Sequence, residues 1–278
     1  MKQTKTVNTI KNNIADTLFI PLYMRCLENR EKQPIFRDSF ACKLVDKIDF
    51  DFSKYDGAKK SAAGVAIRAR YFDEMTKQFI EKNENPVIVH IGCGLDTRYK
   101  RLEPKLAQKV VFYDLDIPEV IDLREKLLPA SENNEYLRSS MFDTSWMDET
   151  KNNHPRGQFL FVAEGVLMYF EKDRVKSLFA DLAARFTSAR ILFDVTNSWM
   201  CKNSHKHETV KLTNASFKLD LDDDKETETW ANNIKLEEVA YYSDFEEWKR
   251  GGLFLYWLMK LVPKFKNSSR ILQVSIDW

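Results

Sequence analysis

The feature that most constrains the fold of this chain is an apolar run that stops at two closely spaced glycines, "VIVHIGCG" at residues 87–94. The β-branched residues predict a buried strand over 87–91, and the glycines predict a sharp turn directly after it. The chain holds only 8 glycines in 278 residues, so two of them at one strand end need a reason. Glycine permits a tight turn, and it lets a ligand approach the backbone where a Cβ atom would otherwise stand.

Strands and helices alternate along the chain on the carboxyl side of this turn. The spacing of apolar residues predicts further strands at 109–116, 136–139, the start of 157–170, 189–197 and 270–276. It predicts helices at 15–29, 38–48, 61–82, 118–129, 171–186 and 243–252. Strands that alternate with helices form βαβ units. The expected fold is therefore α/β, with a Rossmann-like, mostly parallel sheet and helices on both faces.

The segment before the glycine turn reads as a helical cover for this sheet. Pro21 is expected to start or kink the first helix, because proline lacks a backbone N–H, and Ser61 is expected to cap the helix at 61–82. One compact domain is predicted, with three parts: a helical N-terminal lid at 1–83, an α/β core at 84–200 and a C-terminal extension at 201–278.

Composition excludes several classes of partner. The chain has 43 basic and 42 acidic residues, so no basic excess points to nucleic acid. Its four cysteines share no CxxC spacing, which argues against a disulfide framework or a zinc site and favours a reducing compartment. Residues 1–20 lack the apolar core of a signal peptide. We expect a cytoplasmic protein without a membrane partner, in which "GGLFLYWLM" (251–259) is a packed helix and "KLVPKFKNSSR" (260–270) a solvated surface.

The sequence around the glycine turn also limits which ligand the turn can bind. A dinucleotide fingerprint needs a third glycine three positions after Gly94, where this chain has Thr97, so nicotinamide or flavin binding is disfavoured. A turn with two glycines suits a ligand without phosphates, and S-adenosylmethionine is such a ligand. An acid at the end of the next strand is expected to hold the ribose hydroxyls. The stretch "FYDLD" offers Asp114 and Asp116, and Asp116 is preferred because it lies closer to the carboxyl end of the strand.

Three motifs in order, "HIGCGLDTRYKRL", "YDLDIPEVIDLREKLL" and "FVAEGVLMYF", resemble the leucine carboxyl methyltransferase family, including its bacterial polyketide O-methyltransferase-like members. The likeness extends from about Leu18 to Asn197. It implies a class I methyltransferase fold with a helical N-terminal cover. It also implies transfer of a methyl group from S-adenosylmethionine to a carboxylate or hydroxyl oxygen of a small-molecule acceptor.

The resemblance also implies roles for particular residues. Gly92 and Gly94 would flank the methionine part of the cofactor, Asp116 would hold the ribose, and Glu164 would lie near the cofactor. Arg68 or Arg70 of "RARYF" would reach the cofactor or the acceptor carboxylate, and Tyr169 would face the acceptor.

One stretch departs from the family pattern. Where relatives commonly have "D-L-R-D-x-x-W", this chain has "SMFDTSW" at 140–146, so Ser140 replaces an acid expected to contact adenine. Met141 and Asp143 of the same stretch are expected at the cofactor, and a serine hydroxyl can still hydrogen-bond to adenine. The departure leaves open a protein that binds the cofactor without catalysis.

The chain offers few bases for catalysis. His90 lies inside a strand and is expected in the core, and His154 lies in a polar loop. His205 and His207 with Cys201 lack a fourth metal ligand at a recognised spacing, so no metal is expected. A carboxylate acceptor is already ionised at neutral pH and needs no base, whereas a phenol benefits from one. The sequence thus favours a carboxylate of a small molecule, and a protein C-terminal carboxylate remains an alternative.

Overall fold

The computed structural model describes residues 6–7 and 14–277 of the chain. Residues 1–5 and 8–13 of the expected N-terminal lid, and the expected absence of a signal peptide there, therefore lie outside the described residues. The centre of the described part is a seven-stranded sheet in the order β5-β4-β3-β6-β7-β9-β8. Its strands are β3 (Pro86–Ile91), β4 (Val111–Asp116), β5 (Asn134–Arg138), β6 (Gln158–Ala163), β7 (Ala189–Thr196), β8 (Ile234–Tyr241) and β9 (Ser269–Ile276).

Five strands, β3 to β7, pair in parallel, while β9 pairs antiparallel with both β7 and β8. The chain leaves β3 toward β4 and β5 and then returns to β6 on the other side of β3. The strand order therefore reverses at β3, and open α/β sheets bind ligands outside the carboxyl ends of the strands at such a point. The glycine turn at the end of β3 lies there.

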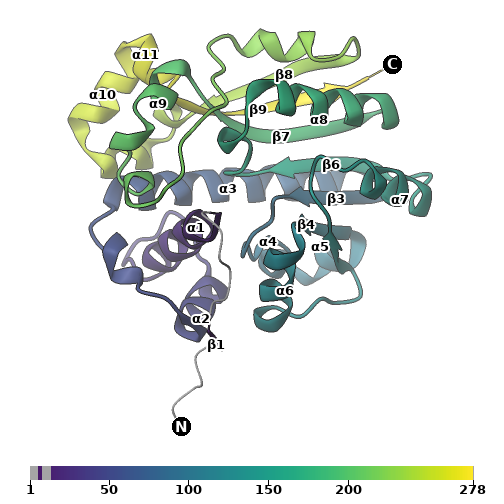
Figure 1. Cartoon of the computed structure of the whole chain (residues 1–278), viewed down its shortest axis with the longest axis horizontal. Helices are drawn as coiled ribbons and strands as arrows, with labels where there is room; N and C mark the ends of the chain where they lie inside the picture. Colours follow the sequence, from purple (N-terminus) through teal and green to yellow (C-terminus); the bar gives the residue numbers. More distant parts are fainter. Residues whose placement is uncertain (1–5, 8–13, 278) are drawn as a thin grey trace.

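Helices cover both faces of the sheet, which confirms the predicted fold class (Figure 1). On one face, α3 (Lys59–Lys82) and α5 (Pro104–Lys109) pack against the sheet through Phe72, Phe79 and Leu106. On the other, α7 (Ser145–Asn153) and α8 (Lys172–Arg185) pack against the sheet. Helix α8 presents apolar residues at helical spacing, which is typical of a helix with one buried side: Val175, Leu178, Phe179 and Leu182.

The N-terminal helices form a separate cluster beside the carboxyl ends of the strands. Helix α1 (Ile14–Asn29) packs with α2 (Ser39–Lys47), a 3₁₀ turn (Phe52–Tyr55) and the end of α6 (Pro118–Leu127). A short pair of parallel strands, β1 (Thr6–Val7) and β2 (Ile48–Asp49), lies at its edge. Helix α1 runs through Pro21 as one helix. Helix α3 begins at Lys59, so Ser61 is not its cap. Instead, the Ser61 N–H donates to the Glu208 carboxylate at 2.8 Å.

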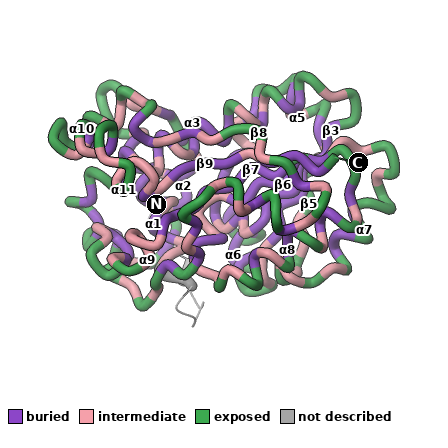
Figure 2. The backbone as a smooth tube through the Cα atoms, turned by 90° about the horizontal axis from the view of Figure 1, so that it is seen from above, coloured by how far each residue is buried: buried purple, intermediate pink, exposed green. Residues whose placement is uncertain are grey.

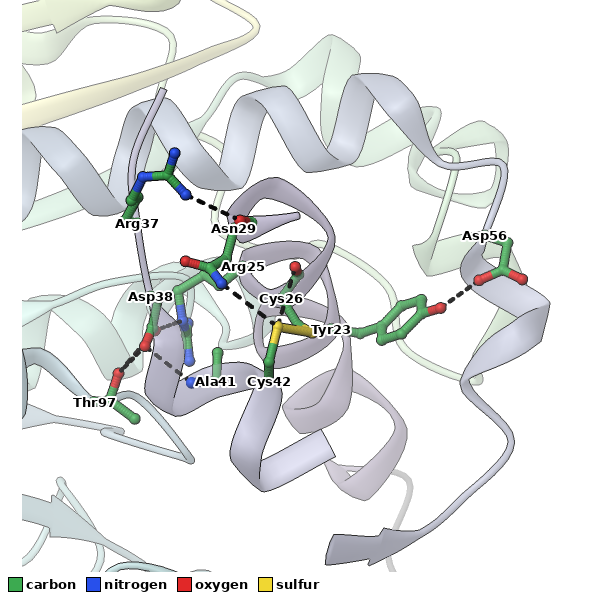
Figure 3. Close-up of a disulfide and its surroundings, with 10 residues drawn as sticks. All are labelled: Tyr23, Arg25, Cys26, Asn29, Arg37, Asp38, Ala41, Cys42, Asp56 and Thr97. Atoms are coloured by element: carbon green, nitrogen blue, oxygen red, sulfur yellow. Dashed lines mark hydrogen bonds and ion pairs between the residues drawn. A yellow bond between two sulfur atoms is a disulfide. The ribbon is translucent and has the colours of Figure 1, made fainter. Parts of the chain in front are cut away.

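One sequence prediction on cysteine is wrong. Cys26 of α1 and Cys42 of α2 form a disulfide, although the spacing rule predicted none (Figure 3). The rule considers only neighbours along the chain, whereas packing of two helices brings together residues 16 positions apart. The disulfide also removes the basis for expecting a reducing compartment. Cys93 and Cys201 are free thiols.

The C-terminal extension differs most from the prediction. Strand β8 was not predicted, because its sequence "IKLEEVAY" carries three charges. It is an edge strand, and edge strands tolerate charges because one side faces solvent. The helix predicted at 243–252 is instead two 3₁₀ segments, at Tyr242–Asp244 and Glu246–Gly251. The remaining elements are α4 (Arg98–Arg101), α9 (Ser198–Lys202), α10 (Leu253–Leu261), α11 (Pro263–Lys266) and short 3₁₀ turns at Leu167–Tyr169, Ser204–Lys206, Val210–Leu212 and Asp224–Thr229.

Candidate active site

A cavity of about 310 Å³ lies at the carboxyl ends of the parallel strands and is called here the turn cavity. Its wall includes both glycines of the turn after β3, Asp116 at the end of β4 and Glu164 after β6. Leu18 of α1 lies across from the turn. The cavity therefore lies beside β3, where the strand order reverses and a ligand site is expected.

The glycine turn has a conformation that other residues rarely adopt. Gly92 and Gly94 have φ values of +65° and +52°. A Cβ atom at Gly92 would lie 2.5 Å from the Val166 side chain. The Gly94 N–H donates to Asp116 Oδ2 at 2.9 Å, and the Ile117 N–H donates to Asp116 Oδ1 at 2.8 Å. Asp116 thus joins the turn to the start of α6.

Asp116 keeps the capacity to bind a ligand, because each carboxylate oxygen can accept more than one hydrogen bond. Burial raises the pKa of Asp116, and the two backbone N–H donors oppose that shift. Asp114, the other candidate, is buried away from the cavity: it accepts hydrogen bonds from Arg124 Nη2 at 2.6 Å and from Asn134 Nδ2 at 2.8 Å. The structure therefore places Asp116, and not Asp114, in the cavity wall.

Glu164 stands between two arginines at the bottom of the turn cavity. Arg68 Nε donates to Glu164 Oε1 at 3.0 Å, and Arg98 Nη2 donates to Glu164 Oε2. Arg68 Nη1 also contacts Asp194 Oδ2 at 2.8 Å, and Asp194 in turn accepts the Gly165 N–H at 2.6 Å. Burial lowers the pKa of Arg68, but Asp194 and Glu164 raise it by more, so the guanidinium stays charged.

The same chain of charges continues under the glycine turn. Arg98 contacts Asp73 at 2.9 Å, Arg101 contacts Asp73 at 2.7 Å, and Arg25 contacts Asp96 at 3.1 Å. All five side chains are nearly or fully buried, and buried charges of this kind must be paired. Asp96 also accepts the Arg98 N–H at 2.7 Å.

The disulfide of the N-terminal cluster lies close to this network (Figure 3). Arg25 precedes Cys26 in α1, and it donates to Asp38 at 3.1 Å and to the Leu95 carbonyl at 3.1 Å. Asp38 accepts the Thr97 hydroxyl at 2.8 Å and caps α2 through the Ala41 N–H at 2.9 Å. The helical cluster is therefore attached to the glycine turn by ion pairs as well as by apolar packing.

The sequence did not indicate Arg25, Asp73, Arg98, Arg101 or Asp194 as parts of the site. Their partners lie far apart in the chain: Asp73 is 25 positions from Arg98, and Asp194 is 126 positions from Arg68. The sequence did hold one signal, the two arginines of "TRYKRL" directly after the glycine turn. A charged side chain in a buried segment requires a partner of opposite charge.

Seven of the predicted site residues lie together in the wall of the turn cavity: Arg68, Gly92, Gly94, Asp116, Met141, Glu164 and Tyr169. Three others do not line it. Arg70 faces away and pairs with Glu247 at 2.5 Å. Ser140 and Asp143 are exposed, and Asp143 accepts the Ser145 N–H at 2.9 Å at the start of α7.

A second cavity, of about 280 Å³, adjoins the first and is called here the apolar cavity. Aromatic residues from the C-terminal half of the chain form much of its wall: Tyr169, Trp199, Phe217, Tyr242, Trp248 and Phe265. The two cavities share wall residues, and these mark the junction between them: Thr17, Pro21, Arg68, Gly165 and Tyr169. Burial raises the pKa of Tyr169 to about 12, so at neutral pH its hydroxyl is a hydrogen-bond donor at this junction.

Two polar side chains in the apolar cavity are available to a ligand. The Ser61 hydroxyl is buried and has no hydrogen-bond partner among the described residues. The His207 Nδ1 accepts the Val210 N–H at 3.4 Å, so the neutral ring carries its proton on Nε2. Burial lowers the pKa of His207, which keeps the ring neutral at pH 7. In the part of the chain that the structure describes, no three His, Cys, Asp or Glu side chains gather to hold a metal ion.

Several known proteins are similar to this chain in sequence or in fold. A family model described as leucine carboxyl methyltransferase matches residues 19–183. The tetracenomycin polyketide synthesis O-methyltransferase TcmP of Streptomyces glaucescens is 26% identical over 94% of this chain and 96% of its own length. The S-adenosyl-L-methionine-dependent methyltransferase dpfgK of Gibberella zeae is 27% identical over 92% of each chain. A crystal structure of a DUF574 family protein from Streptomyces avermitilis superposes with a TM-score of 0.57 at 11% identity, covering 94% of this chain and 97% of that one.

Proposed function

The chain belongs to the leucine carboxyl methyltransferase family, and from this premise we propose that it methylates an oxygen atom of an apolar small molecule. It is an S-adenosylmethionine-dependent methyltransferase. One observation supports the proposal most: the turn cavity and the apolar cavity meet at Arg68 and Tyr169. A cofactor in the first cavity and an acceptor in the second would face each other at that junction.

The turn cavity fits the cofactor by its shape and its donor set. A Cβ atom at Gly92 would collide with Val166, so glycine at this position lets the Val166 side chain pack directly against the turn in the cavity wall. Asp116 has lone pairs left for the ribose hydroxyls. When bound, S-adenosylmethionine supplies an electrophilic methyl group on a sulfonium. Ser140 and Asp143 are exposed and outside the cavity wall, and Met141 is the residue of that stretch that we expect at the adenine.

The junction favours a carboxylate as the acceptor. None of its five described wall residues is a base that titrates near neutral pH, so an acceptor oxygen that is already ionised needs least help. The charged Arg68 attracts a carboxylate, and the protonated Tyr169 donates a hydrogen bond to it. Their role is to align the oxygen and to exclude water, since alignment alone lowers the barrier by several kcal/mol.

The three parts of the chain would divide this work. Residues 84–200 carry the glycine turn and most of the turn cavity. The N-terminal part contributes Thr17, Pro21 and Arg68 to the junction, and residues 201–278 contribute Phe217, Tyr242 and Trp248 to the apolar cavity. Because the apolar wall is largely aromatic, we propose an acceptor with rings.

Calorimetric titration with S-adenosylmethionine tests the cofactor site. Wild type is expected to bind, and Asp116→Ala is expected to lose affinity by at least about tenfold, because two buried acceptor oxygens are removed. Asp122→Ala is the matched control, since that aspartate lies exposed on α6 and pairs with Arg138. Equal loss in both variants would contradict the assignment of Asp116.

A paired acceptor assay tests the reaction. Transfer of a labelled methyl group is compared between 2-naphthoic acid and 2-naphthol, which share a ring system but differ in acidity. The carboxylate is expected to be methylated at neutral pH, and Tyr169→Phe is expected to lower kcat/KM. Transfer to the phenol alone would contradict the carboxylate assignment, and a peptide with a free C-terminus serves as the protein-like alternative.

A further inference from the structure

Helix α10 (Leu253–Leu261) exposes an unusual amount of apolar surface. Among the described residues, five large apolar side chains are exposed, and four of them lie on this helix. Their exposed fractions are 63% for Leu253, 81% for Phe254, 54% for Trp257 and 74% for Leu261. In Figure 2 the helix lies at one end of the long axis of the molecule, largely exposed. Monomeric proteins rarely expose contiguous apolar patches of this kind without a binding role.

The four side chains form one stripe. Their positions i, i+1, i+4 and i+8 fall on one side of an α-helix. The opposite side is also apolar: Tyr256 and Met259 are buried, and Leu255 and Met259 line the apolar cavity. The expectation of a packed helix at 251–259 is therefore met on one side only. An ordinary surface helix has a polar outer side, which α10 lacks.

The segment that carries the stripe is basic. Residues 252–269 contain Lys260, Lys264 and Lys266 and no acidic residue. Within the described chain, none of these three lysines lies within 4.0 Å of a carboxylate oxygen. Instead, Lys264 Nζ lies 5.7 Å from the centre of the Trp199 ring, and Lys266 Nζ lies 4.2 Å from that of Tyr241. In the preceding segment, Glu246 pairs with Lys249. A hydrogen bond with Tyr256 raises the pKa of Lys260, and Glu246 and Asp244 raise it further.

We propose that α10 with its three lysines is an interfacial anchor that binds an anionic lipid bilayer. Helices of this kind bury an apolar stripe with Trp, Phe and Leu at the boundary between headgroups and acyl chains, while lysines reach the headgroups. No described helix is long and apolar enough to cross a membrane, so α10 would lie along the surface. The proposal departs from the expectation that the chain has no membrane partner.

A second copy of the chain is a poorer occupant. A twofold contact through the stripe would bring the lysines of one copy next to the same lysines of the other, with no acid in either segment to compensate. An anionic bilayer satisfies both the apolar stripe and the charge. Because α10 also forms part of the apolar cavity, the anchor would hold that cavity beside the membrane, a consequence that rests on the proposed function.

Vesicle co-sedimentation of the full chain tests the anchor without cofactor or acceptor, so its outcome is independent of methyl transfer. The chain is expected to bind vesicles of phosphatidylcholine mixed with phosphatidylserine, and to bind phosphatidylcholine alone at least about tenfold more weakly. Added salt is expected to weaken binding to the mixed vesicles. The double variant Phe254→Ser/Leu261→Ser and the double variant Lys264→Glu/Lys266→Glu are each expected to lose most of the binding.

Leu212→Ser is the matched control, because Leu212 is the fifth exposed apolar residue and lies off the helix. It is expected to bind like wild type. Absence of wild-type binding to the mixed vesicles, or equal binding by the Phe254→Ser/Leu261→Ser variant, would overturn the proposal. So would a concentration-dependent dimer, measured by sedimentation equilibrium, that this variant abolishes, because the stripe would then bind a second copy.

Discussion

The two cavities that meet at Arg68 are built in opposite ways. The turn cavity is formed by strand ends and a glycine turn. Buried ion pairs, such as Arg68 with Glu164 and Arg98 with Asp73, lie in or next to its wall. The apolar cavity is formed largely by rings and methionines of the C-terminal half, together with polar side chains such as Lys60, Ser61 and Glu208. In the turn cavity Glu164 is held by ion pairs with Arg68 and Arg98. The apolar cavity is instead defined by the size and shape of its side chains, so substitutions there would change which acceptor fits.

The largest expected effect on stability and activity comes from replacing Arg68. Replacing it with methionine leaves Asp194, which is fully buried, and Glu164 without one cationic partner. Breaking a buried ion pair from one side costs about 3–5 kcal/mol. We expect Arg68→Met to lower the free energy of unfolding by that amount, measured by urea denaturation, and to abolish methyl transfer.

Arg70 supplies the control, since it lies two residues away on the same helix. Its pair with Glu247 is partly exposed, and exposed pairs contribute about 0–1 kcal/mol. Arg70→Met is expected to unfold within about 1 kcal/mol of wild type and to retain cofactor binding. Equal destabilisation in the two variants would mean that the buried network is not what distinguishes the turn cavity.

Gly92→Ala is expected to act on the turn cavity alone and with a smaller effect. The added Cβ meets Val166 at 2.5 Å and the backbone is at φ +65°, so the variant is expected to lose about 1–3 kcal/mol of stability. Cofactor affinity, measured by calorimetry, should fall with it. Gly57→Ala is the control, because nothing lies within 4 Å of a Cβ there. A neutral Gly92→Ala would show that the turn needs no bare backbone.

The sequence predicted the turn cavity better than the apolar cavity for a physical reason. The stretches "VIVHIGCG" and "FYDLD" include the ends of adjacent strands, so local patterns and the strand order determine where Gly94 and Asp116 meet. The ion pairs and the apolar wall depend on tertiary packing. Arg68 pairs with Asp194, which lies 126 positions away along the chain. Cys26 and Cys42 form a disulfide only because two helices pack together.

The apolar cavity can be altered without touching the turn cavity. Trp199 lines only the apolar cavity. Removing its ring in Trp199→Ala is expected to raise the KM for the acceptor by about 10- to 100-fold, the range for losing a hydrophobic contact worth about 1–3 kcal/mol. The dissociation constant for S-adenosylmethionine is expected to stay unchanged. A loss of cofactor affinity in this variant would show that the two cavities do not act separately.

The smallest expected effect concerns the pH dependence of the apolar cavity. Burial lowers the pKa of His207 below its ordinary value of 6.5, so the native chain resists a proton that the unfolded chain takes up. The unfolded state then binds more protons, and stability falls as the pH drops below about 6.5. His207→Gln is expected to reduce this acid-side slope of the free energy of unfolding.

His205 is the natural comparison for this measurement, since it lies two residues earlier and is exposed. The slope of His205→Gln is measured beside that of His207→Gln, and His154, whose pKa burial also lowers, contributes equally in all three proteins. If His207→Gln left the slope unchanged, the ring would have to be hydrated rather than set in an apolar wall. The wall of the apolar cavity would then be wet at His207, and burial would not explain its lowered pKa. We expect the His207 ring, neutral at pH 7, to donate a hydrogen bond to the acceptor.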